Sequence, residues 1–151
     1  MKVLMVCLGN ICRSPLAEGI LRNKVEAAGL AWEIDSCGTA GFHVGNPPDP
    51  RSIEVAYKYG IYISNIACRQ FHENDFQEFD LILSMDFSNQ KDIKGLGKNR
   101  DELGKVRMIM DFAFPGKGVS VPDPYYGGAE GFETVYSMLD TACDAIIQKY
   151  R

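Results

Sequence analysis

The opening segment of the chain predicts a strand, a loop and a helix in direct succession, and this unit limits the choice of fold more than any other feature. Val3 to Val6 is a continuous apolar run, which is typical of a strand buried on both faces. Between Leu16 and Ala28 the apolar residues recur with helical spacing; Pro15 suits the first turn of this helix and Gly29 its end. A buried strand that leads into a helix favours an α/β fold, because parallel strands need a crossover of this kind.

The rest of the chain continues to alternate short apolar runs with segments of helical periodicity. The expected strands are residues 31–34, 79–84 and 106–110, and the expected helices are residues 52–59 and 87–93 and one long closing helix after the loop 111–128. Residues 38–50 are rich in glycine and proline, which predicts an irregular loop. The alternation predicts a parallel sheet that is covered by helices on both faces.

The length and composition of the chain fit one globular domain, residues 1–151. Hydrophobic residues make up 46% of the chain and charged residues 24%, which is sufficient for a buried core. The 16 Lys and Arg residues are balanced by 20 Asp and Glu residues and form no basic run, so we expect no nucleic acid partner. The apolar runs are short and the start of the chain lacks the pattern of a signal peptide, so we expect a cytoplasmic protein that does not enter a membrane.

The spacing of cysteine and histidine indicates neither a disulfide framework nor a metal site. The number of cysteines is odd, and a chain of this length does not need disulfides to stabilise its core. Cys7 and Cys12 are not spaced as in a zinc knuckle, and His43 and His72 lie far apart in the sequence. We therefore expect neither a metal ion nor another cofactor.

Residues 7–14, Cys-Leu-Gly-Asn-Ile-Cys-Arg-Ser, combine the features of a phosphate-binding loop. The segment starts at the expected end of the first strand, where ligands bind in parallel α/β sheets, and it ends where the helix begins. Gly9 allows a tight turn and Asn10 tolerates a left-handed backbone, so successive amide groups can point at one anion. We expect this loop to consist of Leu8, Gly9, Asn10, Ile11, Cys12 and Ser14, between Cys7 and the helix.

The same loop contains the groups needed for nucleophilic attack on a phosphate ester. The helix N-terminus, the loop amides and Arg13 all favour the thiolate form of Cys7, which is its nucleophilic form. Arg13 can bind two phosphate oxygens at once, and it binds them more tightly when the transferred group becomes planar. Ser14 can donate a hydrogen bond to the sulfur. We therefore expect Cys7 to be the nucleophile and Arg13 the phosphate ligand.

A thiolate that attacks a phosphate monoester expels an alkoxide or a phenolate, so the site also needs a general acid. The candidate is Asp123, which lies between two prolines and before two tyrosines in Val-Pro-Asp-Pro-Tyr-Tyr-Gly-Gly, residues 121–128. The prolines stiffen this loop. We expect burial against the rings, together with the bound phosphate, to keep the carboxyl protonated until it donates its proton; the carboxylate could then activate water.

The stretch from Val6 to Glu18, Val-Cys-Leu-Gly-Asn-Ile-Cys-Arg-Ser-Pro-Leu-Ala-Glu, closely resembles the signature of the low-molecular-weight protein tyrosine phosphatases. Asp-Pro-Tyr-Tyr at residues 123–126 matches their second motif, and similarity at residues 45–49, 67–70, 79–86 and 131–136 extends over nearly the whole chain. The resemblance implies a three-layer flavodoxin-like α/β fold with a four-stranded parallel sheet. It also implies metal-independent hydrolysis through a phosphocysteine, with Cys7 as nucleophile, Arg13 as phosphate ligand and Asp123 as general acid.

Aromatic side chains are expected to form a deep pocket above Cys7. Phe42 falls where this family commonly places an aromatic residue, and Tyr125 and Tyr126 would lie opposite it, so that a phenyl ring is held between them. Phosphotyrosine would reach a nucleophile at the floor, whereas phosphoserine would be too short. We therefore expect phosphotyrosine-containing proteins and small aryl phosphates as substrates, a tyrosine kinase as a candidate partner, and a monomer or weak dimer.

One departure from the family pattern concerns the support of the phosphate-binding loop. Many members carry a histidine near the position of Ile66, where it joins the hydrogen bonds around the loop asparagine, and this chain has none there. Asn10 could instead be held by Ser36, by Asn65 or by water.

Two other reactions and one binding role use the same scaffold. Arsenate reductases relay the oxidation through two further cysteines, and the segment after residues 79–84, where that family carries them, contains none. Protein-arginine phosphatases usually have threonine at the position of Ile11, so this residue favours phosphotyrosine. A phosphate-binding module without catalysis would need a damaged nucleophile or acid, and both residues are present.

Cys12 follows the expected nucleophile closely enough to form a disulfide with it. We expect peroxide to inactivate the protein reversibly through a bridge between Cys7 and Cys12. Such a bridge would protect Cys7 from irreversible oxidation.

Overall fold

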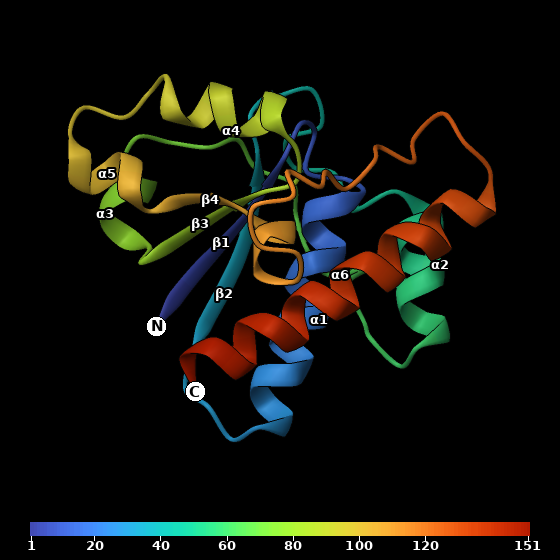
Figure 1. The fold of residues 1–151 in the computed structure, drawn as a ribbon. Helices are drawn as coiled ribbons and strands as arrows, with labels where there is room; N and C mark the ends of the chain where they lie inside the picture. The colour runs from blue at the N-terminus through green and yellow to red at the C-terminus, as the bar shows by residue number, and fades with distance from the viewer.

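The computed structural model describes residues 1–151 as a parallel sheet between two layers of helices (Figure 1). The four strands pair in the order β2-β1-β3-β4, and the predicted three-layer fold with a four-stranded parallel sheet is confirmed. The strands are β1 (Lys2–Cys7), β2 (Glu33–Gly38), β3 (Leu81–Ser84) and β4 (Val106–Met108). The helices are α1 (Arg13–Ala27), α2 (Pro50–Lys58), α3 (Asp75–Glu78), α4 (Phe87–Lys94), α5 (Arg100–Gly104) and α6 (Ala129–Tyr150), with a 3-10 turn at Ile109–Phe112.

Strand β1 is apolar from Val3 onward because it contributes to a core on each face of the sheet. Val3 and Met5 belong to a cluster of 28 buried residues, which also contains the apolar sides of α1, α2 and α6. Leu4 and Val6 belong to a second cluster of 9 buried residues, which includes side chains from α3 and α4. Side chains alternate along a strand, so a strand covered on both faces has no polar face to show in its sequence.

The ends of several elements follow from local chemistry. Gly29 and Gly60 adopt left-handed backbones, with φ of 67° and 78°, directly after α1 and α2. Glycine adopts this conformation without the steric cost that other residues meet. At the start of α2 the Asp49 side chain accepts a hydrogen bond from the Arg51 amide, and Asp86 caps α4 in the same way through Asn89.

Three expectations about the elements need correction. Strand β2 is not residues 31–34: it begins at Glu33 and continues to Gly38, in register with the whole of β1. The strand expected at residues 106–110 ends at Met108 and passes into the 3-10 turn. Helices α3 and α5 were not expected, because they are too short to show a helical period.

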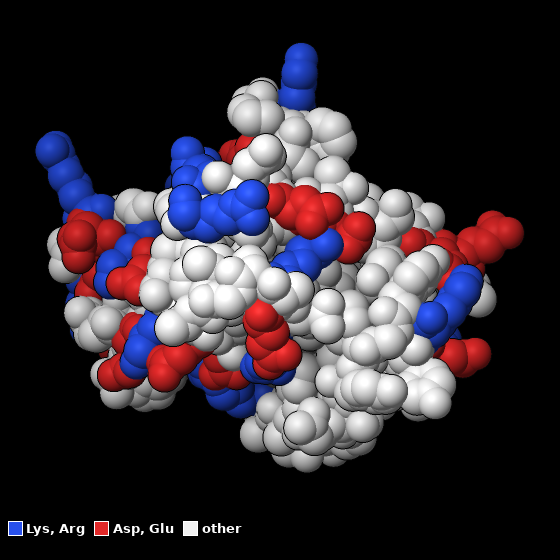
Figure 2. All heavy atoms as spheres, turned by 90° about the horizontal axis from the view of Figure 1, so that it is seen from below, with Lys and Arg blue, Asp and Glu red and all other residues white.

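Charged side chains of both signs are interspersed on the face of the molecule seen in Figure 2. Charged side chains also link helices: Lys24 of α1 contacts Asp140 and Asp144 of α6 at 2.9 and 2.7 Å. Exposed pairs of this kind contribute little to stability, about 1 kcal/mol at most. None of the helices combines the length and the apolar composition that crossing a bilayer requires.

The topology creates a crevice at the carboxyl ends of β1 and β3. From β1 the chain runs through α1 to β2 on one side, whereas β3 lies on the other side of β1. Loops that leave the two central strands therefore diverge, and ligands of parallel α/β sheets bind at such a point. Residues 8–12 follow β1 directly, and Asp86 lies two residues after the end of β3.

Candidate active site

The segment from Cys7 to Ser14 forms a tight loop between β1 and α1. Asn10 has a φ of 57° and is the only residue other than glycine with a positive φ, as its tolerance of the left-handed region predicted. Helix α1 begins at Arg13, and its N-cap residue Cys12 provides no side-chain cap. The first amide groups of α1 are therefore left to point at the loop, where they can bind an anion.

Buried hydrogen bonds hold Asn10 in this conformation. Its Nδ2 donates to Ser14 Oγ at 2.8 Å and to Ser36 Oγ at 3.0 Å, while its Oδ1 accepts from the Arg69 amide at 3.0 Å. Its carbonyl accepts from the Cys68 thiol at 2.7 Å. The side chain of Asn10 thus has a partner for each of its polar atoms, and the loop is rigid without a histidine beside it.

Of the supports considered for Asn10, the structure contains Ser36 and not Asn65. Asn65 makes no hydrogen bond to the loop, and Ile66 packs against the larger core. The Ser36 hydroxyl in turn donates to Glu18 Oε1 at 2.6 Å. Glu18 is 3% exposed and also accepts from Arg22, and burial raises the pKa of its carboxyl. Glu18 lies within the signature, but its role in supporting Ser36 was not predicted from the sequence.

The sulfur of Cys7 lies at the floor of the site, 3.0 Å from Ser14 Oγ. The Ser14 hydroxyl also lies 3.3 Å from the carbonyl of Cys37. One hydroxyl hydrogen can serve only one of these acceptors, so the thiol donates to Ser14 when the hydroxyl donates to the carbonyl. When Cys7 is a thiolate, the hydroxyl can turn and donate to the sulfur.

Arg13 is 3% exposed and is fixed by two elements. Its Nη1 donates to Asp86 Oδ2 at 2.7 Å and to the Val121 carbonyl at 3.0 Å. Asp86 therefore orients the guanidinium and balances its charge, a role that the sequence analysis did not assign. The sequence feature that could have predicted this role is an acidic residue just after a central strand, at the edge of the sheet where ligands bind.

Asp123 lies on the other side of Arg13, with Oδ2 3.9 Å from Arg13 Nη2. Its Oδ1 accepts a hydrogen bond from the Tyr125 amide at 3.0 Å. The expected burial of this carboxyl against the tyrosine rings is wrong, because the Asp123 side chain is 41% exposed and Tyr126 is 92% exposed. Asp123 forms a short turn with Tyr125 that leaves its carboxylate open to solvent.

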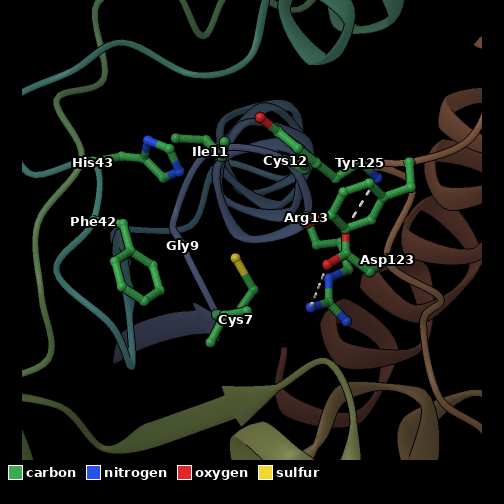
Figure 3. Close-up of a pocket in the computed structure, with 11 residues that line it drawn as sticks. Cys7, Gly9, Ile11, Cys12, Arg13, Phe42, His43, Asp123 and Tyr125 are labelled. Atoms are coloured by element: carbon green, nitrogen blue, oxygen red, sulfur yellow. Dashed lines mark hydrogen bonds and ion pairs between the residues drawn. The ribbon is translucent and has the colours of Figure 1, made fainter.

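These groups surround a cavity of about 340 Å³ that is open to solvent (Figure 3). Figure 3 shows the Cys7 sulfur pointing into the space between Phe42 on one side and Arg13 and Asp123 on the other. Phe42 is 78% exposed, so it stands at the rim of the cavity. His43 contributes to the same wall and was not expected there. The lining residues are Cys7, Leu8, Gly9, Ile11, Cys12, Arg13, Phe42, His43, Asp123, Tyr125 and Tyr126.

Cys12 lines the same cavity as Cys7, and both are free thiols. Burial and, to a smaller extent, the nearby Asp49 carboxylate raise the pKa of Cys12 to about 12. Cys12 is therefore a neutral thiol at physiological pH, in contact with the space that a substrate would occupy. It is therefore a much weaker nucleophile than a thiolate, which is the more reactive form.

Comparison with known proteins gives one family and many close relatives. The family model described as "Low molecular weight phosphotyrosine protein phosphatase" matches residues 2–151. A protein of that name from Schizosaccharomyces pombe is 49% identical over 91% of this chain and 89% of its own, and one from Homo sapiens is 40% identical over 97% and 94%.

Solved structures of similar proteins superimpose closely on this chain. A protein tyrosine phosphatase from Entamoeba histolytica has a TM-score of 0.92 at 37% identity, covering 99% of this chain and 96% of its own. A Drosophila arginine phosphatase has a TM-score of 0.93 at 31% identity, covering 100% and 98%.

Proposed function

The chain belongs to the low molecular weight phosphotyrosine protein phosphatase family, and from this premise we propose that it hydrolyses phosphotyrosine in proteins through a phosphocysteine on Cys7. It is a protein-tyrosine-phosphatase, a hydrolase. The observation that carries the proposal is the position of the Cys7 sulfur, at the floor of an aromatic-rimmed cavity that also presents Arg13 and Asp123. Residues 1–151 are proposed to act as one domain.

In the first step the Cys7 thiolate attacks phosphorus, so that an S–P bond forms and the bond to the tyrosine oxygen breaks. The loop amides and the Arg13 guanidinium bind the phosphate oxygens, and Asp86 keeps the guanidinium aimed at them. Asp123 donates its proton to the departing tyrosine oxygen. Asp123 lines the cavity with its carboxyl partly exposed, so a bound phosphoryl group and phenyl ring would cover it.

In the second step a water molecule attacks phosphorus, and the S–P bond breaks to release inorganic phosphate. The carboxylate of Asp123 accepts the proton of this water, which restores the acid for the next cycle. The sulfur leaves as a thiolate. Ser14 Oγ, 3.0 Å from the sulfur, then donates to it, and Asn10 holds Ser14 in place.

Substrate choice follows from the walls of the cavity. A phenyl ring that enters between Phe42 and Tyr125 is held by apolar contact while its phosphate reaches the floor. Ile11 adds an apolar side chain to the lining, and it offers no hydroxyl to a phosphorylated guanidinium. We therefore place phosphotyrosine ahead of phosphoarginine, although an arginine phosphatase is among the similar structures.

We also propose that Cys12 acts as a redox partner of Cys7. Both thiols line one cavity, so a sulfenic acid on Cys7 would meet the Cys12 thiol before it met a second peroxide molecule. The Cys12 sulfur would attack the sulfenic sulfur, so that an S–S bond forms while the S–O bond breaks, and the thiol proton of Cys12 leaves with the hydroxide as water. A thiol reductant would then restore the active thiol pair.

The proposed function is tested with p-nitrophenyl phosphate in the presence of EDTA and no added metal. The parent protein should turn over, and Cys7→Ser and Arg13→Ala should be inactive. Cys143→Ala is a matched control, because Cys143 is a buried thiol of α6 outside the cavity. Activity in Cys7→Ser at the level of the control would contradict the mechanism. Peptides with phosphotyrosine, phosphoserine or phosphoarginine then measure the substrate choice.

A further inference from the structure

Arg51 connects helix α2 to the loop of residues 122–128, which carries Asp123. From the first turn of α2 its Nη2 donates to the carbonyl of Tyr125 at 3.0 Å, and its Nη1 to the carbonyl of Gly127 at 3.3 Å. Its guanidinium carbon also lies 5.5 Å from the centre of the Tyr125 ring and 4.7 Å from that of Phe132. One side chain therefore contacts the loop backbone, one of the loop's aromatic rings, and α6 behind it.

The Arg51 side chain is itself held in place by Asp49. Asp49 Oδ1 accepts from Arg51 Nε at 3.0 Å, and Oδ2 accepts from Nη2 at 3.0 Å. This two-point contact matches the planar guanidinium to the carboxylate and leaves little freedom in the side chain. Asp49 also caps α2, so the position of Arg51 is tied to the start of that helix.

The same start of α2 is joined to the phosphate-binding loop. The Asp49 amide donates to the carbonyl of Ile11 at 2.8 Å, and the Ser52 hydroxyl donates to the carbonyl of Cys12 at 2.9 Å. Ser52 is fully buried. Residues 49–52 thus contact the loop of the nucleophile at one end and the loop of the acid at the other.

Apart from Arg51, few polar contacts hold the loop of residues 122–128, which carries Asp123. Between Val121 and α6, the hydrogen bonds that connect the loop to other parts of the chain both come from Arg51. Asp123 accepts a hydrogen bond only from the Tyr125 amide within the loop, and its one polar contact outside the loop is the long ion pair with Arg13, at 3.9 Å. Exposed loops with few contacts open at small free-energy cost, so without Arg51 the carboxyl of Asp123 would move away from the substrate more readily.

We propose that Arg51 is a positioning residue that holds Asp123 over the phosphate-binding loop. The inference rests on the proposed role of Asp123 as general acid. Arg51 touches neither Asp123 nor the reacting atoms; it fixes the backbone at Tyr125, whose amide binds the Asp123 carboxylate. A displacement of about 1 Å in a catalytic group can lower the rate about 100-fold, so the contacts of Arg51 with the loop are expected to affect the rate of the reaction.

The test compares kcat/KM for two substrates that differ in their need for an acid. Phenolate is a poorer leaving group than p-nitrophenolate, so phenyl phosphate depends more on proton donation than p-nitrophenyl phosphate does. Arg51→Ala should lower kcat/KM for phenyl phosphate by about 10-fold or more, and by a smaller factor for p-nitrophenyl phosphate. Arg51→Lys keeps the charge but lacks the planar fork, so it should show a smaller loss in the same direction. If Arg51→Ala does not fold, this variant carries the comparison.

A double-mutant cycle separates positioning from a general structural effect. In an Asp123→Ala background there is no acid to position, so Arg51→Ala should change kcat/KM for phenyl phosphate by no more than about twofold. Lys58→Ala is the matched control: Lys58 is another cation of α2 that contacts α6, through Glu133, without touching the loop. It should leave both substrates unaffected.

The outcomes distinguish this inference from the proposed function. If Asp123→Ala alone does not affect phenyl phosphate, the proposed acid is wrong. If Asp123→Ala has its full effect, but Arg51→Ala lowers kcat/KM equally in both backgrounds or not at all, only the role of Arg51 is contradicted.

Discussion

Replacing Gly38 by alanine should damage phosphate binding, although Gly38 lines no part of the cavity. Gly38 ends β2 and pairs with Cys7 across the sheet. A Cβ atom at this position would lie 2.6 Å from the carbonyl oxygen of Leu8 and 3.0 Å from the carbonyl carbon of Gly9. Both atoms belong to the backbone of the phosphate-binding loop. Gly38 has no left-handed backbone to preserve, so the effect of the substitution comes from this contact alone.

The size of the effect follows from the distances. A carbon and a carbonyl oxygen normally approach to about 3.3 Å or more, so the loop would have to move by roughly 0.7 Å. Overpacking of this kind costs about 1–3 kcal/mol of stability. A shift near 1 Å in catalytic groups can cost about 100-fold in rate, so we expect kcat/KM to fall by about 10- to 100-fold. The inhibition constant for inorganic phosphate should rise in the same variant.

Gly19→Ala provides the matched control. Its Cβ would meet Ile63 Cγ2 at 2.5 Å and Ile61 Cγ2 at 2.9 Å, which is as close a contact as that at Gly38, but against side chains away from the cavity. Both variants should lose stability in urea unfolding, and only Gly38→Ala should lose phosphate affinity. Equal inhibition constants for phosphate in the two variants would refute the reasoning.

Further predictions concern the surroundings of the same site. Asp86→Asn should raise the inhibition constant for phosphate about 10-fold, because a hydrogen bond to a charged group contributes about 1.5–3 kcal/mol. Asn can still cap α4, so the helix should stay intact. An unchanged inhibition constant would exclude a role of Asp86 in orienting Arg13. Cys12→Ser should make peroxide inactivation irreversible by dithiothreitol, whereas recovery like that of the parent would exclude the bridge to Cys7. The hydrogen bond from Arg51 lowers the pKa of Asp49. The Asp49 carboxylate therefore stabilises the fold at a pH above its usual pKa of 3.8, and this stabilisation is lost as the pH falls through the lowered pKa. Asp49→Asn should therefore destabilise the protein by about 1 kcal/mol or less at pH 7, and a loss in urea unfolding that persists at low pH would contradict the pairing.

The sequence predicted best those features that depend on neighbouring residues. The buried run of β1, the left-handed Asn10 and the loop from Cys7 to Ser14 follow from residue types in direct succession, and the structure contains all three. The family resemblance is confirmed over residues 2–151. The limits of β2 were harder to predict, because its polar residues, such as Asp35, interrupt the apolar pattern that is typical of a buried strand.

Features that depend on contacts between distant segments could not be predicted from the sequence. Asp86 and Arg13 are far apart in the chain and meet only because two central strands end at the same edge of the sheet. The contacts of Arg51 with the loop of Asp123 depend in the same way on how α2 packs against α6. The exposure of Asp123 depends on how its loop lies over the rest of the chain, which neither its prolines nor its tyrosines specify.

The central claim is that Cys7 carries the phosphoryl group during turnover, and chemical trapping of the intermediate tests it most directly. Protein mixed with p-nitrophenyl phosphate is quenched within the first turnover, digested, and analysed by mass spectrometry and phosphorus NMR. The account predicts a phosphoryl group bonded to the sulfur of Cys7 and a burst of p-nitrophenol equal to the enzyme concentration. Phosphate on another residue, or full turnover with no covalent intermediate and retained activity in Cys7→Ser, would contradict it.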